Sequence, residues 1–132
     1  MAVSNRKATF TADIKEVWEA VVSLTEYSWR RDVASIQVLK PGKQFVEQTK
    51  DGFSTIFTIT AFQPYRRYEF DLENANLKGH WTGLFSCHNG ETTVEFTEDV
   101  TAKKALLKPF VKGYLKKQQA AYFADLAKRL KG

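Results

Sequence analysis

The last third of the chain has the pattern of one long helix, whereas the middle has the pattern of short strands. Between Lys103 and Gly132 there are one proline and one interior glycine, and apolar residues recur every three or four positions. The recurring apolar positions are Leu106, Leu107, Phe110, Val111, Tyr114, Leu115, Ala121, Tyr122, Leu126 and Leu130. This is the period of an amphipathic helix, and about 29 residues at about 1.5 Å each would span a small domain. Because a long helix over a strongly curved sheet leaves space beneath it, we expect the functional site in that space.

Six segments in the middle of the chain alternate apolar and polar side chains and end at turn residues. Strands are predicted at residues 36–39, 44–49, 53–62, 68–72, 78–88 and 92–100. The pairs Pro41-Gly42, Asp51-Gly52 and Asn89-Gly90 are turn signals between them. Six strands joined by tight turns form an antiparallel meander, since a helix at each end cannot supply parallel crossovers.

The first third predicts one further strand and a helix. Residues 7–12 are β-prone, and Asp13 then stands at the N-cap position of a helix, with Glu16 completing a capping box. Residues 28–32 are expected to form one more short helical turn. The predicted order is therefore β-α-α-β6-α, an α+β fold. The lone first strand needs a partner, which it would find at the free edge of the sheet.

Length and composition indicate one domain over residues 1–132. The chain is large enough for its own core, and its 43% hydrophobic and 27% charged residues are ordinary for a globular protein. No stretch approaches the roughly 20 apolar residues of a membrane span, so no integral membrane association is expected. The first ten residues lack the apolar core of a signal peptide, and the single Cys87 cannot form an intrachain disulfide. We therefore expect a cytoplasmic protein.

The positive charge is concentrated in the last 30 residues. From Lys103 onward there are nine lysines and arginines against Asp125 alone, whereas the preceding residues carry a net charge of −3. The lysines alternate with apolar residues at helical period, so we interpret them as the solvated outer face of a helix that packs by its other side. Contact with anionic lipid or nucleic acid is the alternative. We expect no nucleic-acid partner.

Four segments of the chain resemble, in the right order, those of the START-like or SRPBCC superfamily. These are residues 10–18 (FTADIKEVW), 29–33 (WRRDV), 62–70 (FQPYRRYEF) and 89–96 (NGETTVEF). The superfamily includes polyketide cyclase/dehydrase-like proteins and the birch-pollen-allergen type. The resemblance implies a helix-grip fold, in which a curved six- to seven-stranded antiparallel sheet wraps around a long C-terminal helix. It is a poor guide to activity, because one fold supports many functions.

The resemblance also implies a cavity between the concave face of the sheet and the final helix. Aromatic residues make up 14% of the chain, and large rings either fill a core or line an apolar pocket. From side-chain alternation, helical position and the resemblance, we expect the ligand-binding residues to be Trp29, Phe57, Tyr68, Phe70, Trp81, Phe85, Phe96, Glu98, Phe110, Tyr114 and Tyr122. For the set as a whole, lining a pocket is the favoured interpretation.

Glu98 is the best candidate for a catalytic residue, although none is identified by a motif. It alternates with Phe96 and Val100 and should point inward, where an apolar environment raises the pKa of a carboxyl group. The alternative is that Glu98 lies at the open end of the sheet, in water or paired with a lysine. The direction of Glu47 is ambiguous from its strand.

Other residue types suggest no further chemistry. His80 and His88 lie eight residues apart on one strand, too far apart to share a metal, and both should point outward. Cys87 is expected to be a small buried apolar side chain rather than a nucleophile. The pairs at 30–31 and 66–67 are basic; we expect them to be solvated, with a mouth for an anionic ligand as the alternative. No metal or cofactor is expected.

The favoured function is binding of a small hydrophobic or amphipathic ligand, such as a lipid, a polyketide or an aromatic metabolite. The first alternative is an enzyme of the polyketide cyclase/dehydratase kind that uses Glu98 with Tyr114 or Tyr68 as acid and base. The second alternative is a protein–protein interaction module, which a large exposed apolar patch would favour. The chain is expected to be a monomer or a homodimer.

Overall fold

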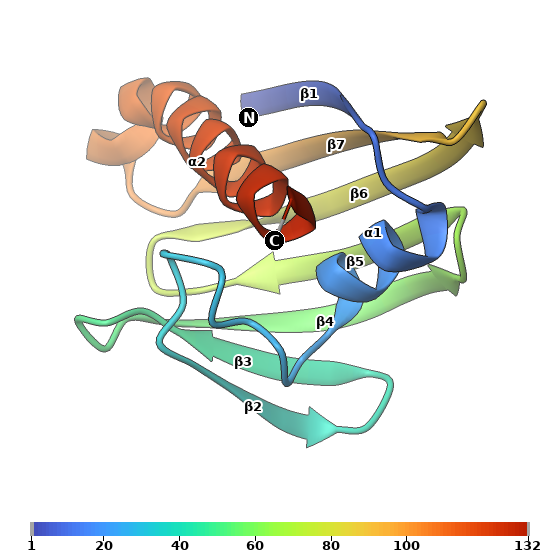
Figure 1. The fold of residues 1–132 in the computed structure, drawn as a ribbon. Coiled ribbons are helices and arrows are strands. Elements are labelled where there is room, and N and C mark those ends of the chain that lie inside the picture. The colour runs from blue at the N-terminus through green and yellow to red at the C-terminus, as the bar shows by residue number, and fades with distance from the viewer. Residues whose placement is uncertain (1, 132) are drawn as a thin grey trace.

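The computed structural model describes residues 2–131. Met1, where the expected domain begins, and Gly132, where the final helix is expected to end, lie outside the described residues. The chain forms a single sheet covered on one face by two helices (Figure 1). Its elements are, in order, β1 (Ala2–Phe10), α1 (Ile14–Val22), β2 (Ser35–Lys40), β3 (Gln44–Gln48), β4 (Ser54–Gln63), β5 (Arg67–Glu73), β6 (Leu77–His88), β7 (Glu91–Ala102), the 3₁₀ helix η1 (Ala105–Phe110) and α2 (Val111–Lys131).

The seven strands form one antiparallel sheet in the order β1-β7-β6-β5-β4-β3-β2. Strands β2 to β7 follow one another as a meander, and β1 pairs with β7 at one edge. The predicted α+β class, the antiparallel meander and the edge position of the first strand are all confirmed. The first strand is longer than predicted and begins at Ala2 rather than at residue 7.

Glycines allow the tight turns that the sequence indicated. Gly52 and Gly90 have φ values of 84° and 78°, in the left-handed region that residues with a Cβ rarely enter. Asn89 also has a positive φ of 51°, so the Asn-Gly pair between β6 and β7 has the conformation of a tight hairpin turn. These turns fix the register of neighbouring strands and hence the residues that face the helices.

Two glycines in β6 make room for neighbouring groups. A Cβ on Gly79 would collide with the backbone of β7 at Asp99 and Val100, and a Cβ on Gly83 would collide with the indole of Trp81. The missing side chains let β6 and β7 approach closely and let Trp81 lie along its own strand toward Gly83.

The final helical segment is divided into η1 and α2 rather than continuous from residue 103. Pro109 lies inside η1 and has no N–H for an α-helical hydrogen bond. The 21 residues of α2 still cross the sheet (Figure 1). The C-terminal end of α2 approaches α1, and residues 28–32 form turns rather than a second short helix.

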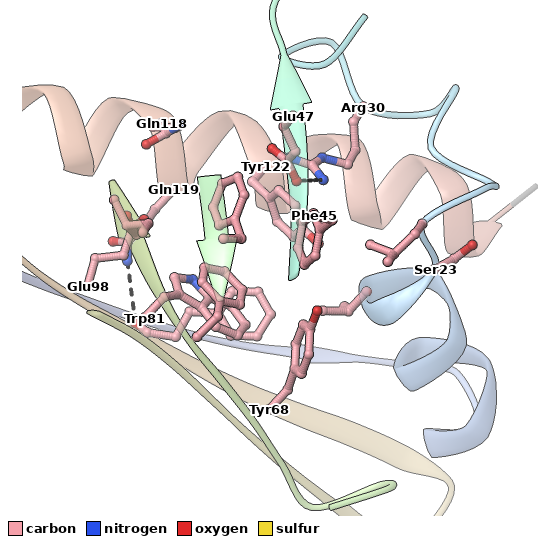
Figure 2. A pocket seen from close by; sticks show the side chains of 16 residues that line it. Ser23, Arg30, Phe45, Glu47, Tyr68, Trp81, Glu98, Gln118, Gln119 and Tyr122 are labelled. Atoms are coloured by element: carbon pink, nitrogen blue, oxygen red, sulfur yellow. Dashed lines mark hydrogen bonds and ion pairs between the residues drawn. The ribbon is translucent and has the colours of Figure 1, made fainter. Parts of the chain in front are cut away.

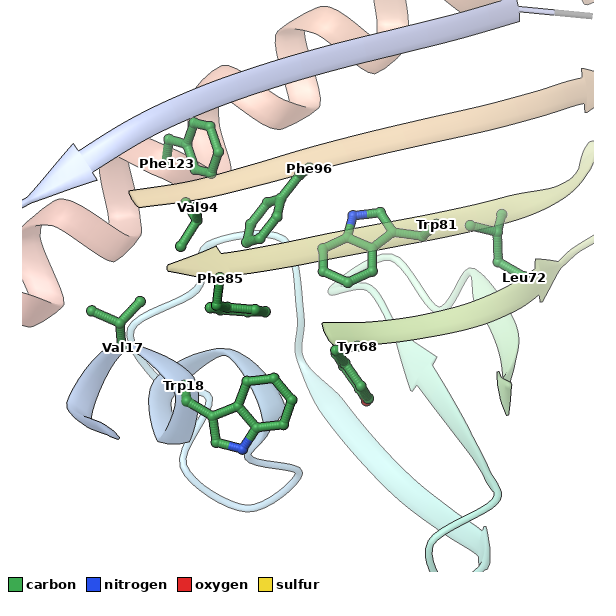
Figure 3. Close-up of a cluster of buried hydrophobic side chains, with 9 residues drawn as sticks. All are labelled: Val17, Trp18, Tyr68, Leu72, Trp81, Phe85, Val94, Phe96 and Phe123. Atoms are coloured by element: carbon green, nitrogen blue, oxygen red, sulfur yellow. The ribbon is translucent and has the colours of Figure 1, made fainter. Parts of the chain in front are cut away.

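The core lies between the sheet and the two helices (Figure 3). Its central side chains are Val17, Trp18, Tyr68, Leu72, Trp81, Phe85, Val94, Phe96 and Phe123. The expected N-cap is present, since the carboxylate of Asp13 accepts a hydrogen bond from the amide of Lys15. Leu115 and Leu126 of α2 are completely buried, while Lys104, Lys108, Lys112 and Lys116 are exposed, as the periodicity predicted.

Candidate ligand-binding cavity

A cavity of about 100 Å³ lies between the sheet, α2 and the segment that joins α1 to β2. Its walls are formed by Val21, Ser23, Leu24, Arg30, Phe45, Glu47, Phe57, Tyr68, Phe70, Leu72, Trp81, Phe96, Glu98, Gln118, Gln119 and Tyr122 (Figure 2). Most of these side chains are apolar or aromatic, and a few polar groups are placed among them. This is the composition typical of small-molecule sites.

Aromatic rings from neighbouring strands form the floor of the cavity. Phe70 and Trp81 are cross-strand partners whose rings stack with centroids 4.7 Å apart. Trp81 also contacts Phe96 at 4.7 Å, and Phe57 contacts Phe70 edge-on at 5.0 Å. Each ring is therefore held by another ring, which fixes the shape of the floor.

Arg30 brings a buried charge to the cavity from the α1–β2 segment. Its guanidinium donates hydrogen bonds to both carboxylate oxygens of Glu47, at 3.0 and 3.1 Å, and to both of Asp32, at 2.9 and 3.1 Å. It also lies 5.2 Å from the ring centre of Tyr122. Burial alone would lower the pKa of Arg30, but Glu47 and Asp32 outweigh that effect and raise it. The cation is thus permanently charged and already shared by two anions.

Two further contacts fasten the α1–β2 segment to α2. The Asp125 carboxylate accepts hydrogen bonds from the backbone amide of Arg31 at 2.9 Å and from its guanidinium at 2.8 Å. The indole of Trp29 packs edge-on against Tyr122 with ring centroids 5.4 Å apart. Residues 23–34, which we call the covering segment, therefore lie over the cavity. Arg31 and Trp29 attach this segment to α2.

Glu98 is the cavity group without a partner. It faces inward from β7 beside its cross-strand neighbour Trp81, and Figure 2 shows it near Gln119 as well. Among the described residues no side chain forms a hydrogen bond or an ion pair with its carboxylate. Burial, together with the negative charges of Asp32 and Glu47, raises its pKa to about 7. At neutral pH, Glu98 is therefore divided between its acid and carboxylate forms.

The other polar groups of the cavity differ in the hydrogen bonds that they form. Gln119 is buried, accepts a hydrogen bond from the Ser4 hydroxyl at 2.7 Å and donates to the Ser4 carbonyl at 3.2 Å. Burial raises the pKa of the Tyr68 and Tyr122 hydroxyls, so both stay protonated at physiological pH. A ligand can thus meet neutral hydroxyl donors as well as the Glu98 carboxyl group.

Seven of the eleven predicted ligand-binding residues line this cavity, namely Phe57, Tyr68, Phe70, Trp81, Phe96, Glu98 and Tyr122. Their role in ligand binding stays a prediction. Glu98 points inward and is half-buried, and no lysine among the described residues pairs with it. Glu47, whose direction the sequence left ambiguous, lies in the same cavity.

The other four predicted residues lie elsewhere. Phe85 is buried in the core against Trp18, with ring centroids 4.9 Å apart. Trp29 belongs to the covering segment. Phe110 and Tyr114 are 70% and 52% exposed and border a separate groove outside the cavity, whereas their neighbours Val111 and Leu115 are buried against β7.

Nine of the sixteen lining residues were not predicted as ligand-binding, and Arg30 and Phe45 show why. The side chain of Arg30 forms ion pairs inside the protein rather than being solvated. Because Glu47 and Asp32 occupy its guanidinium, Arg30 does not form a mouth for an anionic ligand. Phe45 lies on the same face of β3 as Glu47, so recognising Phe45 as buried would have directed both residues inward. No local pattern in the sequence reveals that Arg30 meets Glu47.

Outside the cavity, the structure corrects one further prediction. Cys87 is exposed rather than buried. His80 points outward as predicted, but its ring nitrogens lie 2.7 Å from carboxylate oxygens of both Glu69 and Asp71. Among residues 2–131, no group of three or more His, Cys, Asp or Glu side chains is placed to hold a metal ion.

Residues 1–131 match the family described as polyketide cyclase / dehydrase and lipid transport. The chain belongs to this family. The predicted relationship to START-like proteins is confirmed. The family description covers both enzymes and lipid transport, so membership does not by itself decide between catalysis and binding. No curated protein sequence gives a significant match.

Several solved structures that carry different names share this fold. A START superfamily protein from Mycobacterium smegmatis has a TM-score of 0.84 at 15% identity, covering 99% of this chain and 98% of that one. The Aha1 dimer from Colwellia psychrerythraea gives 0.78 at 12% identity, covering 98% and 96%. Ara h 8.0201 gives 0.74 at 14% identity, covering 98% of both chains. These similarities confirm the helix-grip fold. Neither helix in the described part of the chain is long and apolar enough to cross a bilayer.

Proposed function

We propose that this family member binds a small hydrophobic or amphipathic molecule in the cavity between the sheet and α2. The observation that carries the proposal is a preformed space walled mainly by apolar and aromatic side chains, with Glu98 unpartnered in one wall. Burial of apolar ligand surface supplies about 25 cal/mol per Å² before ordering costs are subtracted. A lipid, a polyketide or an aromatic metabolite would present such surface.

The size of the cavity limits what it holds while the covering segment is closed. Its volume of about 100 Å³ is below the roughly 300–1,000 Å³ of drug-sized sites. A dry cavity of about 150 Å³ is known to admit benzene. The present cavity is smaller than that, so even a ligand of one aromatic ring requires the lining to relax, and a larger ligand requires the covering segment to move.

Binding is tested most directly by fluorescence, because Trp81 lies in the cavity floor. A hydrophobic fluorescent probe should bind with micromolar affinity and quench Trp81. Phe70→Ala should change probe affinity through the shape of the floor, although such a truncation costs about 3–5 kcal/mol of stability. Phe53→Ala removes a ring that is 37% exposed and does not line the cavity, and should leave affinity unchanged. Native mass spectrometry of protein from its host would identify a retained ligand. No quenching and no retained ligand would contradict the proposal.

An enzyme of the polyketide cyclase/dehydratase kind is the second candidate function. It is favoured by the raised pKa of Glu98, since a carboxyl group that titrates near neutral pH can donate or accept a proton. Tyr68 supplies a protonated hydroxyl in the same cavity, whereas Tyr114 lies largely outside it. In an enzyme, Glu98→Gln should abolish turnover while a neutral ligand still binds. In a carrier, there is no turnover to lose.

A protein–protein interaction module is the third candidate. It is favoured by three exposed apolar side chains at the start of the C-terminal segment, Leu106 (87% exposed), Phe110 (70%) and Tyr114 (52%). If they form a homodimer contact, Leu106→Asp should lower the apparent mass in sedimentation at high concentration. A monomer at every concentration would leave the homodimer without support. A cytoplasmic location stays a proposal that depends on the sequence alone.

A further inference from the structure

More acidic than basic side chains surround the cavity. Among the described residues that line it, Arg30 is the one cation, and both Glu47 and Asp32 already bind its guanidinium. Glu98 adds a third carboxyl group that has no counter-ion. No lysine, histidine or second arginine belongs to the lining. A ligand therefore finds a carboxyl group to pair with and no free cation.

This balance discriminates between ligands by the charge of their polar end. A carboxylate or phosphate would enter a region where Arg30 is occupied and where Glu47 and Glu98 repel it, so binding would require protonation or the loss of an existing ion pair. A neutral hydroxyl group can form hydrogen bonds with Glu98 but brings no charge to balance its carboxylate. A protonated nitrogen gains both a charge-assisted hydrogen bond and relief of the unpaired carboxylate.

The surroundings of Glu98 are also suited to a cation. Its cross-strand neighbour Trp81 and its neighbour Phe96 on the same face of β7 present aromatic rings to the cavity. The faces of such rings carry a negative electrostatic potential that attracts ammonium groups within about 6 Å. The apolar part of the same ligand would then rest on Phe70 and Phe57.

We propose that the ligand of this cavity is a cationic amphiphile, in which a protonated amine pairs with Glu98 and an aromatic or aliphatic body lies on the ring floor. The proposal rests on the function proposed above and assigns the chemical class of the ligand. It requires no movement of Arg30, whose two ion pairs stay intact. It places fatty acids and other anionic amphiphiles among the poor ligands.

Binding of a cation should be coupled to proton release from Glu98. The charged and titratable groups around it are Arg30 and Asp32 from the covering segment, Glu47 from β3, Tyr68 from β5, and Tyr114 and Tyr122 from α2. The pKa of each tyrosine is raised, and Arg30 stays charged, so neither the tyrosines nor Arg30 titrate near neutral pH. A bound ammonium keeps Glu98 ionised and therefore expels the proton that it carries below about pH 7.

The first experiment compares three single-ring probes of similar shape by calorimetry on the intact chain: protonated 2-phenylethylamine, 2-phenylethanol and 3-phenylpropionate. At about pH 8, the amine should bind at least about tenfold more tightly than the alcohol, and the carboxylate most weakly. At about pH 6.5, amine binding should release more than about half a proton per ligand, measured in buffers of different ionisation enthalpy. The alcohol should release none.

Variants on β7 assign the preference to Glu98. Glu98→Gln should weaken amine binding by about tenfold or more, abolish proton release and change the affinity for the alcohol by less than about threefold. Glu95→Gln removes the same charge from the outer face of the same strand, where Asn5 donates a hydrogen bond to Glu95, and should leave all three affinities unchanged.

The outcomes separate this proposal from the one on which it rests. If the alcohol binds as tightly as the amine, or the carboxylate binds best, the cationic assignment is overturned while ligand binding stands. If the amine preference survives in Glu98→Gln, the assignment to Glu98 is overturned. If none of the three probes binds, both proposals are overturned.

Discussion

At the scale of single residues, the position of Glu98 makes ionisation of its carboxyl group unfavourable in the folded protein. Its carboxyl group is held in an aromatic wall with two other acidic side chains nearby, and its pKa rises from 4.5 to about 7. In the unfolded chain the same group ionises freely in water. The folded state therefore holds a proton that the unfolded state releases.

The consequence is a stability that falls with pH. Since the folded pKa of Glu98 exceeds the unfolded one, its contribution is most favourable below about pH 4.5, declines up to about pH 7 and is constant above. The shift corresponds to a decline on the order of 3 kcal/mol, at 1.36 kcal/mol per pH unit. Glu98→Gln should therefore raise the free energy of unfolding at about pH 8 and remove much of this slope in urea titrations. An unchanged slope, equal to that of Glu95→Gln, would contradict the buried position.

Gly83 offers a second test at this scale. A Cβ at Gly83 would collide with the indole of Trp81, so Gly83→Ala should displace that ring toward the cavity and destabilise the protein by about 1–3 kcal/mol. Affinity for 2-phenylethanol should fall with it. Gly113→Ala is the matched control, because Gly113 lies in α2 with no atom near the added methyl group. It should stabilise the protein by about 0.5–1 kcal/mol in thermal unfolding. Equal effects of the two substitutions would argue against the close contact of Gly83.

How much of the site the sequence predicts depends on the range of the interactions. Alternation along β7 correctly directs Phe96 and Glu98 inward, because that rule depends only on neighbouring residues. The pairing of Arg30 with Glu47 depends on where a covering segment without helix or strand crosses the sheet, and nothing local encodes that. The exposure of Phe110 is likewise hidden from the sequence, since the apolar period continues through Pro109 while the side chain lies outside the core.

At the scale of elements, the covering segment is a stretch without regular secondary structure between Val22 and Ser35. Backbone hydrogen bonds from Ser23 and Ala34 hold its two ends, and side chains attach its middle to α2. Asp125 provides the attachment to α2, and its own carboxylate is 9% exposed. Arg31 outweighs the effect of burial and lowers the pKa of Asp125, so the attachment is ionised at neutral pH.

Removing that attachment should loosen the segment without unfolding the core. Asp125→Ala deprives the Arg31 backbone amide of its acceptor and should lower the free energy of unfolding by about 1–3 kcal/mol. Hydrogen exchange in residues 23–34 should accelerate, and ligand association should become faster. Lys103→Ala, which removes an exposed ion pair with Glu73, should change neither measurement appreciably. Exchange in residues 23–34 that matches the parent chain would show that the segment is held by other contacts.

At the scale of the whole molecule, the architecture is more predictable than the contents of its cavity. The turn pairs at Asp51-Gly52 and Asn89-Gly90 and the alternation between them determine the meander, and the apolar period after Lys103 determines a helix that must cover it. Whether the rings beneath that helix meet or leave a space depends on differences of about one methyl group in packing. Those differences are set by contacts such as that of Trp81 with Gly83 and are not visible in the period of the sequence.

Burial of α2 against the sheet should be required for the fold as a whole. Leu126 is completely buried, so Leu126→Asp places an unpaired charge in the interior, at several kcal/mol in a protein whose total stability is of the order of 5–15 kcal/mol. We expect this variant to lose its cooperative thermal transition and its near-ultraviolet circular dichroism. Ala124→Asp puts the same residue on the exposed face of the same helix and should cost less than about 1 kcal/mol. Its transition should remain cooperative and close to that of the parent chain. A Leu126→Asp variant that melts like the parent would mean that the sheet holds its structure without α2 and that the cavity has no roof.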